Sequence, residues 1–173
     1  TVYRWVEQHL NPQRAAYTVH RLDRAANGLM IIAHRKRIAA AFTGMFEKRV
    51  IEKRYRAIVH GQIPDAATSI PIRTEIDGRS AVSHVQSLQF QPQLKRTLVE
   101  VLIETGRKHQ IRRHLAEIGY PIVGDRLYSN REDPEDLQLS AHYLSFPCPV
   151  SKIRQEYTVP KELVLAMKSA SVE

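Results

Sequence analysis

The chain has 173 residues, which suits a single domain with its own core, and its 43% hydrophobic and 25% charged content excludes disordered and low-complexity classes. Its 26 basic residues outnumber 18 acidic ones, and 18 of the basic residues are arginines, a surplus that fits a polyanionic partner such as nucleic acid as well as a merely basic domain. The single cysteine excludes an internal disulfide and a cysteine-rich zinc site, and no apolar run reaches the length of a membrane span.

The first half of the chain alternates between helical and strand periodicity. The pattern predicts a weak helix over 1–10, an extended segment over 18–23, a buried strand over 28–33, an amphipathic helix over 35–49 and a strand over 53–60. The helix over 35–49 is the clearest of these elements, because its apolar side chains fall on one stripe.

The second half is richer in strands. We expect a loop with one short strand over 62–77, strands over 81–90 and 97–104, a polar loop over 129–136, strands over 140–146 and 156–159, and a short closing helix over 161–168. A second clear helix is expected to start near Arg107, with Thr105 as its N-cap and Gly119 as its C-cap. The sum is an α+β domain with a mostly antiparallel mixed sheet and a few flanking helices.

The segment His20-Arg21-Leu22-Asp23-Arg24 places a carboxylate among cations just before the expected strand over 28–33. In an extended segment Arg21 and Asp23 point to the same side, because strand side chains alternate. Reactive groups are often presented at the end of a sheet. A solvated charge cluster at a strand end would have the same sequence, so both interpretations stay open.

A second segment places Arg107 and Lys108 in the first turn of the expected helix. The helix dipole favours anions at that end, so two cations there call for an offsetting anion. Asp23 or a phosphate at the helix N-terminus could supply it. The alternative is that both side chains simply extend into solvent.

The third segment, Lys53-Arg54-Tyr55-Arg56, places a tyrosine among three cations on a strand. Aromatic rings stack on bases while cations meet phosphates, so this pattern suits single-stranded or flipped nucleotides, although a strand tyrosine can equally be core packing. His109 and His114 are five residues apart and do not share a helix face, so we expect no metal site.

Together these segments resemble the signatures of RluA-type RNA pseudouridine synthases. The stretch from His20 to Leu29 is similar to the family's catalytic motif, and Lys53-Arg54-Tyr55-Arg56-Ala57 to its tyrosine motif. The stretch from Thr105 to Leu115, with Gly119 to Asp125 after it, is similar to the third signature. The motifs occur in the family's order, and the resemblance covers roughly residues 1–160.

The resemblance implies a role for each residue that carries it. Asp23 would be the catalytic aspartate, Tyr55 would pack against the target uracil, and Arg107 would pair with Asp23 inside the site. The expected substrate-binding residues are Arg21, which would enter the RNA stack, Ile111, which would form an apolar wall beside the base, Arg24 and Lys108.

The implied activity is isomerisation of specific uridines in structured rRNA or tRNA. It needs no cofactor and no metal, and the aspartate could attack C1′, add to C6 or remove a ribose proton. The resemblance further implies that residues 1–173 form the catalytic domain, without the family's usual N-terminal part and without an S4 domain. A cytoplasmic location, a monomeric state and no membrane association are the default expectations for such a sequence. An RNA-binding module of the same fold that has lost catalysis is the alternative, and a basic DNA-binding domain is a third interpretation.

Overall fold

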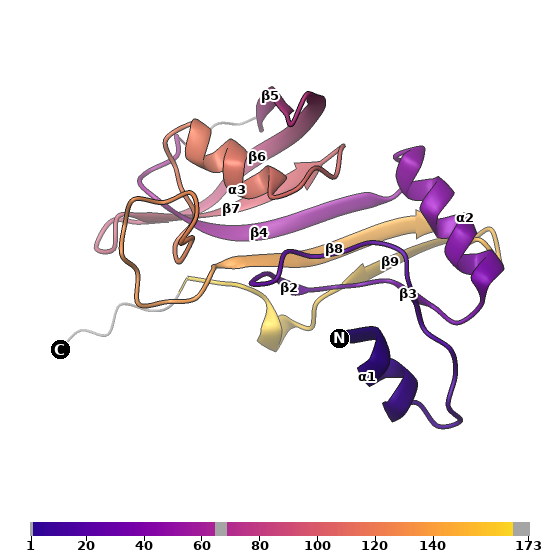
Figure 1. Cartoon of the computed structure of the whole chain (residues 1–173). Helices are drawn as coiled ribbons and strands as arrows, with labels where there is room; N and C mark the ends of the chain where they lie inside the picture. Colours follow the sequence, from indigo (N-terminus) through magenta and orange to yellow (C-terminus); the bar gives the residue numbers. More distant parts are fainter. Residues whose placement is uncertain (1, 65–68, 168–173) are drawn as a thin grey trace.

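The protein is described by a computed structural model that covers residues 2–64 and 69–167. In chain order the elements are α1 (Val2–His9), β1 (Tyr17–Thr18), β2 (Asn27–Gly28), β3 (Ile32–Ala33), α2 (Lys36–Glu47), β4 (Glu52–His60), β5 (Ile70–Ile76), β6 (Arg79–Gln91), β7 (Arg96–Ile103), α3 (Gln110–Glu117), β8 (Leu139–Pro147), β9 (Arg154–Thr158) and a 3-10 turn over Lys161–Leu163. The expected α+β class with a mostly antiparallel sheet is confirmed (Figure 1). Within the described ranges, no helix is both long and apolar enough to cross a bilayer.

The main sheet has the strand order β2-β8-β4-β7-β6-β5, and β9 also pairs with β8. The pairing of β2 with β8 is parallel, and the other pairings in this sheet are antiparallel. The short strands β1 and β3 form a separate antiparallel pair. Because β2 is tied to β8, the loop that precedes β2 is held over the middle of the main sheet (Figure 1).

One face of β4 adjoins two of the protein's hydrophobic clusters. Side chains at Lys53, Tyr55, Ala57 and Val59 alternate with those of the opposite face, as strand geometry requires. Ala57 and Val59 belong to the core cluster that includes Ile111 and Leu115 of α3. A second cluster joins Phe42 of α2 to Ile51 and to two side chains of β8. The face of β4 that carries Lys53 and Tyr55 therefore lies between two packed cores.

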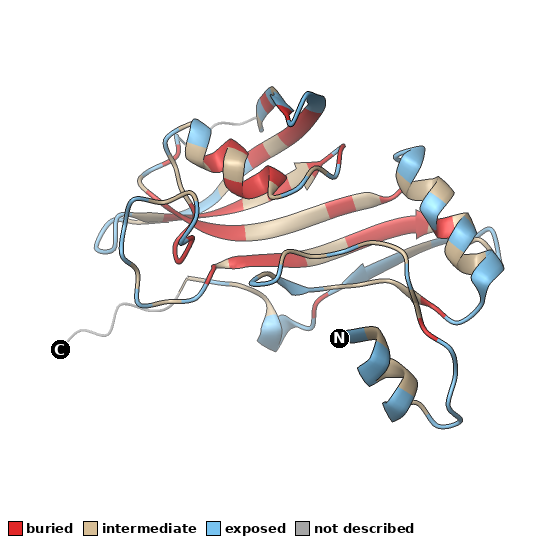
Figure 2. Ribbon diagram, in the orientation of Figure 1, coloured by how far each residue is buried: buried red, intermediate tan, exposed pale blue. Residues whose placement is uncertain are grey.

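Burial follows this arrangement (Figure 2). Buried residues concentrate in β4, β6, β7, β8 and the inner side of α3, whereas α1 buries none of its residues. His114 is fully buried, and both ring nitrogens have a partner: one lies 2.9 Å from the Ser83 hydroxyl and the other 3.1 Å from that of Thr74. Burial lowers the pKa of His114 from its usual value, which favours the neutral ring.

Three expectations from the sequence are wrong in detail. The stretch over 28–33 is not one buried strand, because β2 and β3 pair with different partners. The helix expected from Arg107 begins at Gln110, with His109 rather than Thr105 at its N-cap. The closing helix expected over 161–168 is only a 3-10 turn over Lys161–Leu163, and residue 168 lies outside the described residues. The one strand expected within 62–77 is present as β5, a seven-residue edge strand that tolerates Pro71.

Gly28 fixes the approach of β2 to β8. Its φ is +110°, and a Cβ at this position would lie 2.2 Å from the carbonyl oxygen of Ala141. Neither the backbone conformation nor the space tolerates a side chain, so we expect Gly28→Ala to reduce the free energy of unfolding by about 2 kcal/mol or more, measured by urea denaturation.

The control is Gly44→Ala in α2, where a Cβ would meet no atom within 4 Å. Alanine is the better helix former, so we expect this change to stabilise the protein by about 0.5–1 kcal/mol. Equal effects of the two substitutions would contradict the close contact between β2 and β8.

Candidate active site

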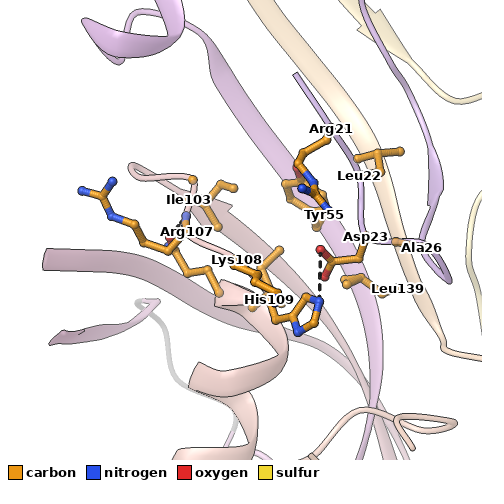
Figure 3. Close-up of a pocket in the computed structure, with 13 residues that line it drawn as sticks. Arg21, Leu22, Asp23, Ala26, Tyr55, Ile103, Arg107, Lys108, His109 and Leu139 are labelled. Carbon is orange, nitrogen blue, oxygen red and sulfur yellow. Dashed lines mark hydrogen bonds and ion pairs between the residues drawn. The ribbon is translucent and has the colours of Figure 1, made fainter. Parts of the chain in front are cut away.

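A pocket opens where the loop before β2 passes over β4 and the start of α3. It is lined by side chains from these three segments, among them Asp23, Tyr55, His109 and Ile111 (Figure 3). Ile103, Ile111 and Leu139 are buried and give the pocket apolar walls. Asp23, Tyr55 and Ile111, which lie far apart in the sequence, are thus brought together as expected.

The loop that carries Asp23 is closed by backbone and side-chain hydrogen bonds. The Ala26 amide donates to the Asp23 carbonyl oxygen at 3.0 Å, and the Leu29 amide donates to that of Ala141 at 2.8 Å. The Ile31 amide donates to Nε2 of His20 at 2.9 Å, which requires that nitrogen to be unprotonated. Burial, with the nearby Lys53 charge, lowers the pKa of His20 to about 4, so this bond persists at neutral pH.

The cation that faces Asp23 is Arg112. One of its terminal nitrogens lies 3.9 Å from Oδ2 of Asp23. The other side of the guanidinium donates two hydrogen bonds to Asp125, at 2.8 Å from Nε and 2.6 Å from a terminal nitrogen. Both residues of this pair are buried, with 6% of Arg112 and 2% of Asp125 exposed. The forked pair therefore holds the guanidinium rigidly beside Asp23.

Further hydrogen bonds hold the Asp125 carboxylate in place and keep it charged. Its Oδ1 also accepts the amides of Leu127 and Tyr128. Burial alone would raise the pKa of Asp125, but the bonds from Arg112 and the Leu127 amide outweigh burial and lower it. The hydrogen bond to Asp125 in turn raises the pKa of Arg112 above its usual value. Both groups therefore stay charged at any physiological pH.

A second route connects Asp23 to the same network. Nε2 of His109 lies 3.9 Å from Oδ1 of Asp23, drawn as a dashed line in Figure 3, and Nδ1 lies 2.9 Å from the Tyr128 hydroxyl. The Tyr128 ring lies 5.1 Å below the Arg112 guanidinium. His109 has a positive φ of 53°, which turns its ring back toward the loop. Asp23 is thus flanked by two nitrogen-bearing side chains that Tyr128 connects.

Tyr55 reaches the same pocket from β4. A shift in register between Arg54 and Tyr55 occurs where β4 pairs with β8, and the ring packs at the margin of the main core. Burial, with a smaller contribution from the Asp23 charge, raises the pKa of Tyr55 from 10.0 to about 12. The phenol is therefore protonated throughout the neutral range, and can donate a hydrogen bond but not act as a phenolate.

The raised pKa of Tyr55 predicts a pH effect on stability. The unfolded chain ionises this phenol near pH 10 and the folded chain near pH 12, so the folded state holds the extra proton between these values. We therefore expect wild-type stability to fall as the pH rises from 10 to 12. Urea denaturation across this range should show a smaller fall for Tyr55→Phe, and the substitution should leave the number of tyrosines that ionise near pH 10 unchanged. A decrease by one in an ultraviolet titration would contradict the raised pKa.

The expected pairing of Arg107 with Asp23 is wrong. Nε of Arg107 donates to the carbonyl oxygen of Ser80 at 3.0 Å, and the side chain extends away from Asp23 (Figure 3). Arg107 and Lys108 precede α3 instead of occupying its first turn, so the conflict with the helix dipole does not arise. Gln110 causes this offset, because its buried Oε1 accepts the Arg107 amide at 3.0 Å and the Thr105 hydroxyl at 2.7 Å.

The remaining expected residues divide into two groups. Arg21, Lys108 and Ile111 line the pocket, whereas Arg24 is exposed and does not line it. The basic cluster around Tyr55 is also divided. Of its three cations only Lys53 shares a face of β4 with Tyr55. On the opposite face Arg54 pairs with Glu52 and Glu100, and Arg56 donates to the Leu165 carbonyl oxygen.

Sequence reasoning missed the second layer of the site: Arg112, Asp125, His109 and Tyr128. His109, Arg112 and Asp125 all lie within the third signature, but nothing in the sequence indicates that Arg112 pairs with Asp125 thirteen residues away. Within residues 2–64 and 69–167 no three histidine, cysteine or acidic side chains are grouped as a metal ion would require.

The chain is similar in sequence to known RNA pseudouridine synthases. Residues 6–117 match the family model described as RNA pseudouridylate synthase. An uncharacterized RNA pseudouridine synthase of Chloroflexus aurantiacus is 38% identical over 156 residues, which are 82% of this chain and 49% of that protein. The dual-specificity RNA pseudouridine synthase RluA of Vibrio parahaemolyticus is 34% identical over 161 residues, covering 82% and 64%.

Among solved structures, the human RNA pseudouridylate synthase domain containing 1 superposes with a TM-score of 0.74 at 22% identity, over 87% of this chain and 71% of that one. This similarity shows the same fold. The chain thus spans about half to two thirds of the length of the two bacterial relatives.

Proposed function

This chain belongs to the RNA pseudouridylate synthase family, and we propose on that basis that it converts uridine in RNA to pseudouridine, with Asp23 as its catalytic carboxylate. The observation that carries the proposal is the position of Asp23. Its carboxylate faces a pocket with an aromatic ring and apolar walls, and it lies 3.9 Å from an arginine that a buried carboxylate holds in place.

The isomerisation of uridine requires few protein groups beyond this carboxylate and the pocket around it. The N1–C1′ bond of uridine breaks, the uracil turns, C5 bonds to C1′, and the proton of C5 is lost while N1 gains one. Atoms and electrons balance within the nucleoside. Asp23 would act on the ribose C1′, on C6 of the base or on a ribose proton, and each route brings the carboxylate within bonding distance of the flipped nucleotide.

The surrounding side chains would hold the base for this rearrangement. The Tyr55 ring would stack against the uracil, and Ile103, Ile111 and Leu139 would exclude water from it. Arg112 would act as the cation beside Asp23, the role that the sequence assigned to Arg107. Since Arg112 is fixed by Asp125, its charge is already in place before the substrate binds.

The substrate would be a structured rRNA or tRNA, consistent with the dual-specificity name of the Vibrio relative. Taking a base out of a helix is unfavourable by a few kcal/mol, and contacts to the protein have to offset it. Arg21, Arg107 and Lys108 at the rim of the pocket would contribute them. Arg24 would contact RNA outside the pocket. We propose that residues 1–173 act as the catalytic domain.

The test uses bulk tRNA and rRNA whose uridines carry tritium at C5. Formation of the C5–C1′ bond displaces that atom, so the purified chain should release tritium to water and leave pseudouridine in the digested RNA. Binding of the same RNA without release of tritium would favour the alternative, an RNA-binding module of this fold without catalysis.

A further inference from the structure

Lys53 is a buried cation that the proposed reaction does not use. Only 9% of the residue is exposed. Within the described part of the chain its ammonium makes no hydrogen bond or ion pair, and it faces an open pocket rather than the closed core. The ammonium instead makes a cation–π contact with the Phe46 ring, whose centroid lies 5.7 Å away. A buried charge is unfavourable unless an opposite charge offsets it, so Lys53 is unusual in the free protein.

The environment of Lys53 adds charge of the same sign. Burial and the neighbouring Arg49 lower the pKa of Lys53 from 10.5 to about 8, which leaves the ammonium mostly charged at pH 7. Arg49 itself is exposed and lies in the turn between α2 and β4. Within the described residues neither cation forms an ion pair with a carboxylate, although the Arg49 charge contributes to lowering the pKa of Glu104 in the same pocket. The repulsion between these two cations is unfavourable in the free protein, and a bound anion would reduce it.

That space is a second pocket, adjoining the first. Lys53 and Arg49 line it, and both pockets share Arg21, Tyr55 and Arg107 in their walls. Lys53 and Tyr55 are neighbours on one face of β4, so the ammonium lies one side-chain position beyond the ring that would hold the uracil. The Lys53 Nζ would lie 3.9 Å from a Cβ added at Gly106, so the glycine backbone approaches the ammonium closely.

The acidic groups of this second pocket do not neutralise it. Glu47 and Glu104 line it, but Glu104 already accepts a hydrogen bond from His84 at 2.7 Å. Glu47 is exposed at the end of α2. The lining cations outnumber these two carboxylates: Arg21, Arg49, Lys53 and Arg107. An excess of guanidinium and ammonium groups beside a base-sized pocket matches a phosphate on the same nucleic-acid strand.

We propose that this second pocket is a phosphate subsite, in which Lys53 and Arg49 bind the backbone phosphate next to the nucleotide whose base enters the Asp23 pocket. The inference rests on the proposed function for the identity of that nucleotide, but not for the phosphate chemistry. Lys53 is thereby a substrate-binding residue of the RNA backbone and not a group that reacts with the base.

The test replaces Lys53 with methionine, which keeps an unbranched apolar stem against Phe46. Affinity for bulk tRNA is measured by filter binding over a series of salt concentrations, with Lys161→Met as the control. Lys161 is an exposed lysine of the 3-10 turn, and its removal changes the net charge equally. We expect Lys53→Met to weaken binding about tenfold or more and to reduce the salt slope by about one, and Lys161→Met to change neither.

The free proteins provide a second readout. If Lys53 is an uncompensated cation, its removal should raise the melting temperature of the free protein by about 2 °C or more, and added tRNA should stabilise wild type more than Lys53→Met. A lysine that merely covers apolar surface would leave RNA affinity unchanged on substitution. Equal affinity and equal salt slope for Lys53→Met and Lys161→Met would overturn the proposal.

The wild-type chain can be tested even if the variant fails to fold. With lysines labelled at the ε-carbon, one of the eight ammonium groups should titrate near pH 8, and tRNA should move that titration above pH 9. The charged and titratable groups that face it are Arg49, Arg21, Arg107, His20, Tyr55, Glu47 and Glu104. An unmoved titration in saturating tRNA would overturn the subsite.

These measurements separate the subsite from the reaction. A wild-type chain that releases no tritium, but whose tRNA affinity depends on Lys53, would refute the proposed isomerase activity and support the phosphate subsite. A chain that releases tritium equally well with methionine at position 53, at unchanged affinity and salt slope, would support the activity and refute the subsite.

Discussion

Asp23→Asn is expected to lower the rate of tritium release by about 10³-fold or more, while RNA binding and folding stay close to those of wild type. The amide has nearly the shape of the carboxylate but neither its charge nor its ability to bond to carbon or accept a proton. The Arg112 and His109 nitrogens lie 3.9 Å away, beyond hydrogen-bond distance, so the fold depends little on the Asp23 charge. The loss would therefore report on the reaction.

The matched control is Asp77→Asn. Asp77 is an exposed aspartate that pairs with Arg113 at 2.9 Å outside the pocket, so its neutralisation changes the net charge equally. We expect its tritium release to match wild type within about twofold, because exposed ion pairs contribute little. Equal release by Asp23→Asn and wild type would remove Asp23 from the mechanism.

A result in which neither wild type nor Asp23→Asn releases tritium, although both bind RNA, would favour the binding-module alternative. The geometry argues against that outcome. Asp125 is 2% exposed and Arg112 6%, and such a buried pair is seldom favourable for stability alone, since apolar side chains of similar volume often serve better. Its presence beside Asp23, whose side chain is partly exposed, fits a need for a fixed positive charge at that point.

The candidate residues that sequence reasoning found are those whose neighbours in the chain identify them. Asp23, Tyr55 and Ile111 each sit in a short motif, and the structure brings all three to one pocket. Strand periodicity over 53–60 also places Lys53 and Tyr55 on one face of β4. Local pattern was sufficient for Tyr55 and Ile111, because the direction of each side chain follows from its own strand or helix, whereas Asp23 lies in a loop and is identified by its motif alone.

The partner of Asp23 could not be found in this way. A helix that starts at Arg107 puts that guanidinium at the helix end, whereas a helix that starts at Gln110 puts Arg112 in the first full turn and frees Arg107. The choice depends on the buried amide of Gln110, which bonds to Ser83 and the Val82 carbonyl oxygen of a strand 27 and 28 residues away. Such tertiary contacts override the local capping signal of Thr105.

The split of residues 28–33 into two short strands has a similar origin. The apolar run Leu29-Met30-Ile31-Ile32 has the composition of a buried strand. Gly28, however, pairs with Ala141 of β8, and Ile32 pairs with Thr18 of β1, so the run crosses from one sheet to the other. The crossing holds the Asp23 loop over the main sheet, and the sequence of the run contains no signal for it.

The second large expected effect distinguishes Arg112 from Arg107 as the arginine that acts beside Asp23. Arg112→Lys should lower tritium release by about 100-fold or more, since an ammonium cannot keep both oxygens of Asp125 and also face Asp23. Arg107→Lys should reduce it by less than about tenfold, because the Arg107 guanidinium bonds only to a backbone carbonyl oxygen. Single-turnover rates at saturating RNA measure both variants while excluding differences in affinity.

The lysine variant is preferred over Arg112→Met because removing one partner of a buried pair leaves the other charge uncompensated, at about 3–5 kcal/mol of stability. Urea denaturation of each variant shows whether the lost rate reflects a misfolded site. A loss of the same size in a variant that is as stable as wild type would assign the effect to the charge beside Asp23. If Arg107→Lys instead proves the slower enzyme, the pairing expected from the sequence forms in the RNA complex, and the loop before α3 has to rearrange when the substrate binds.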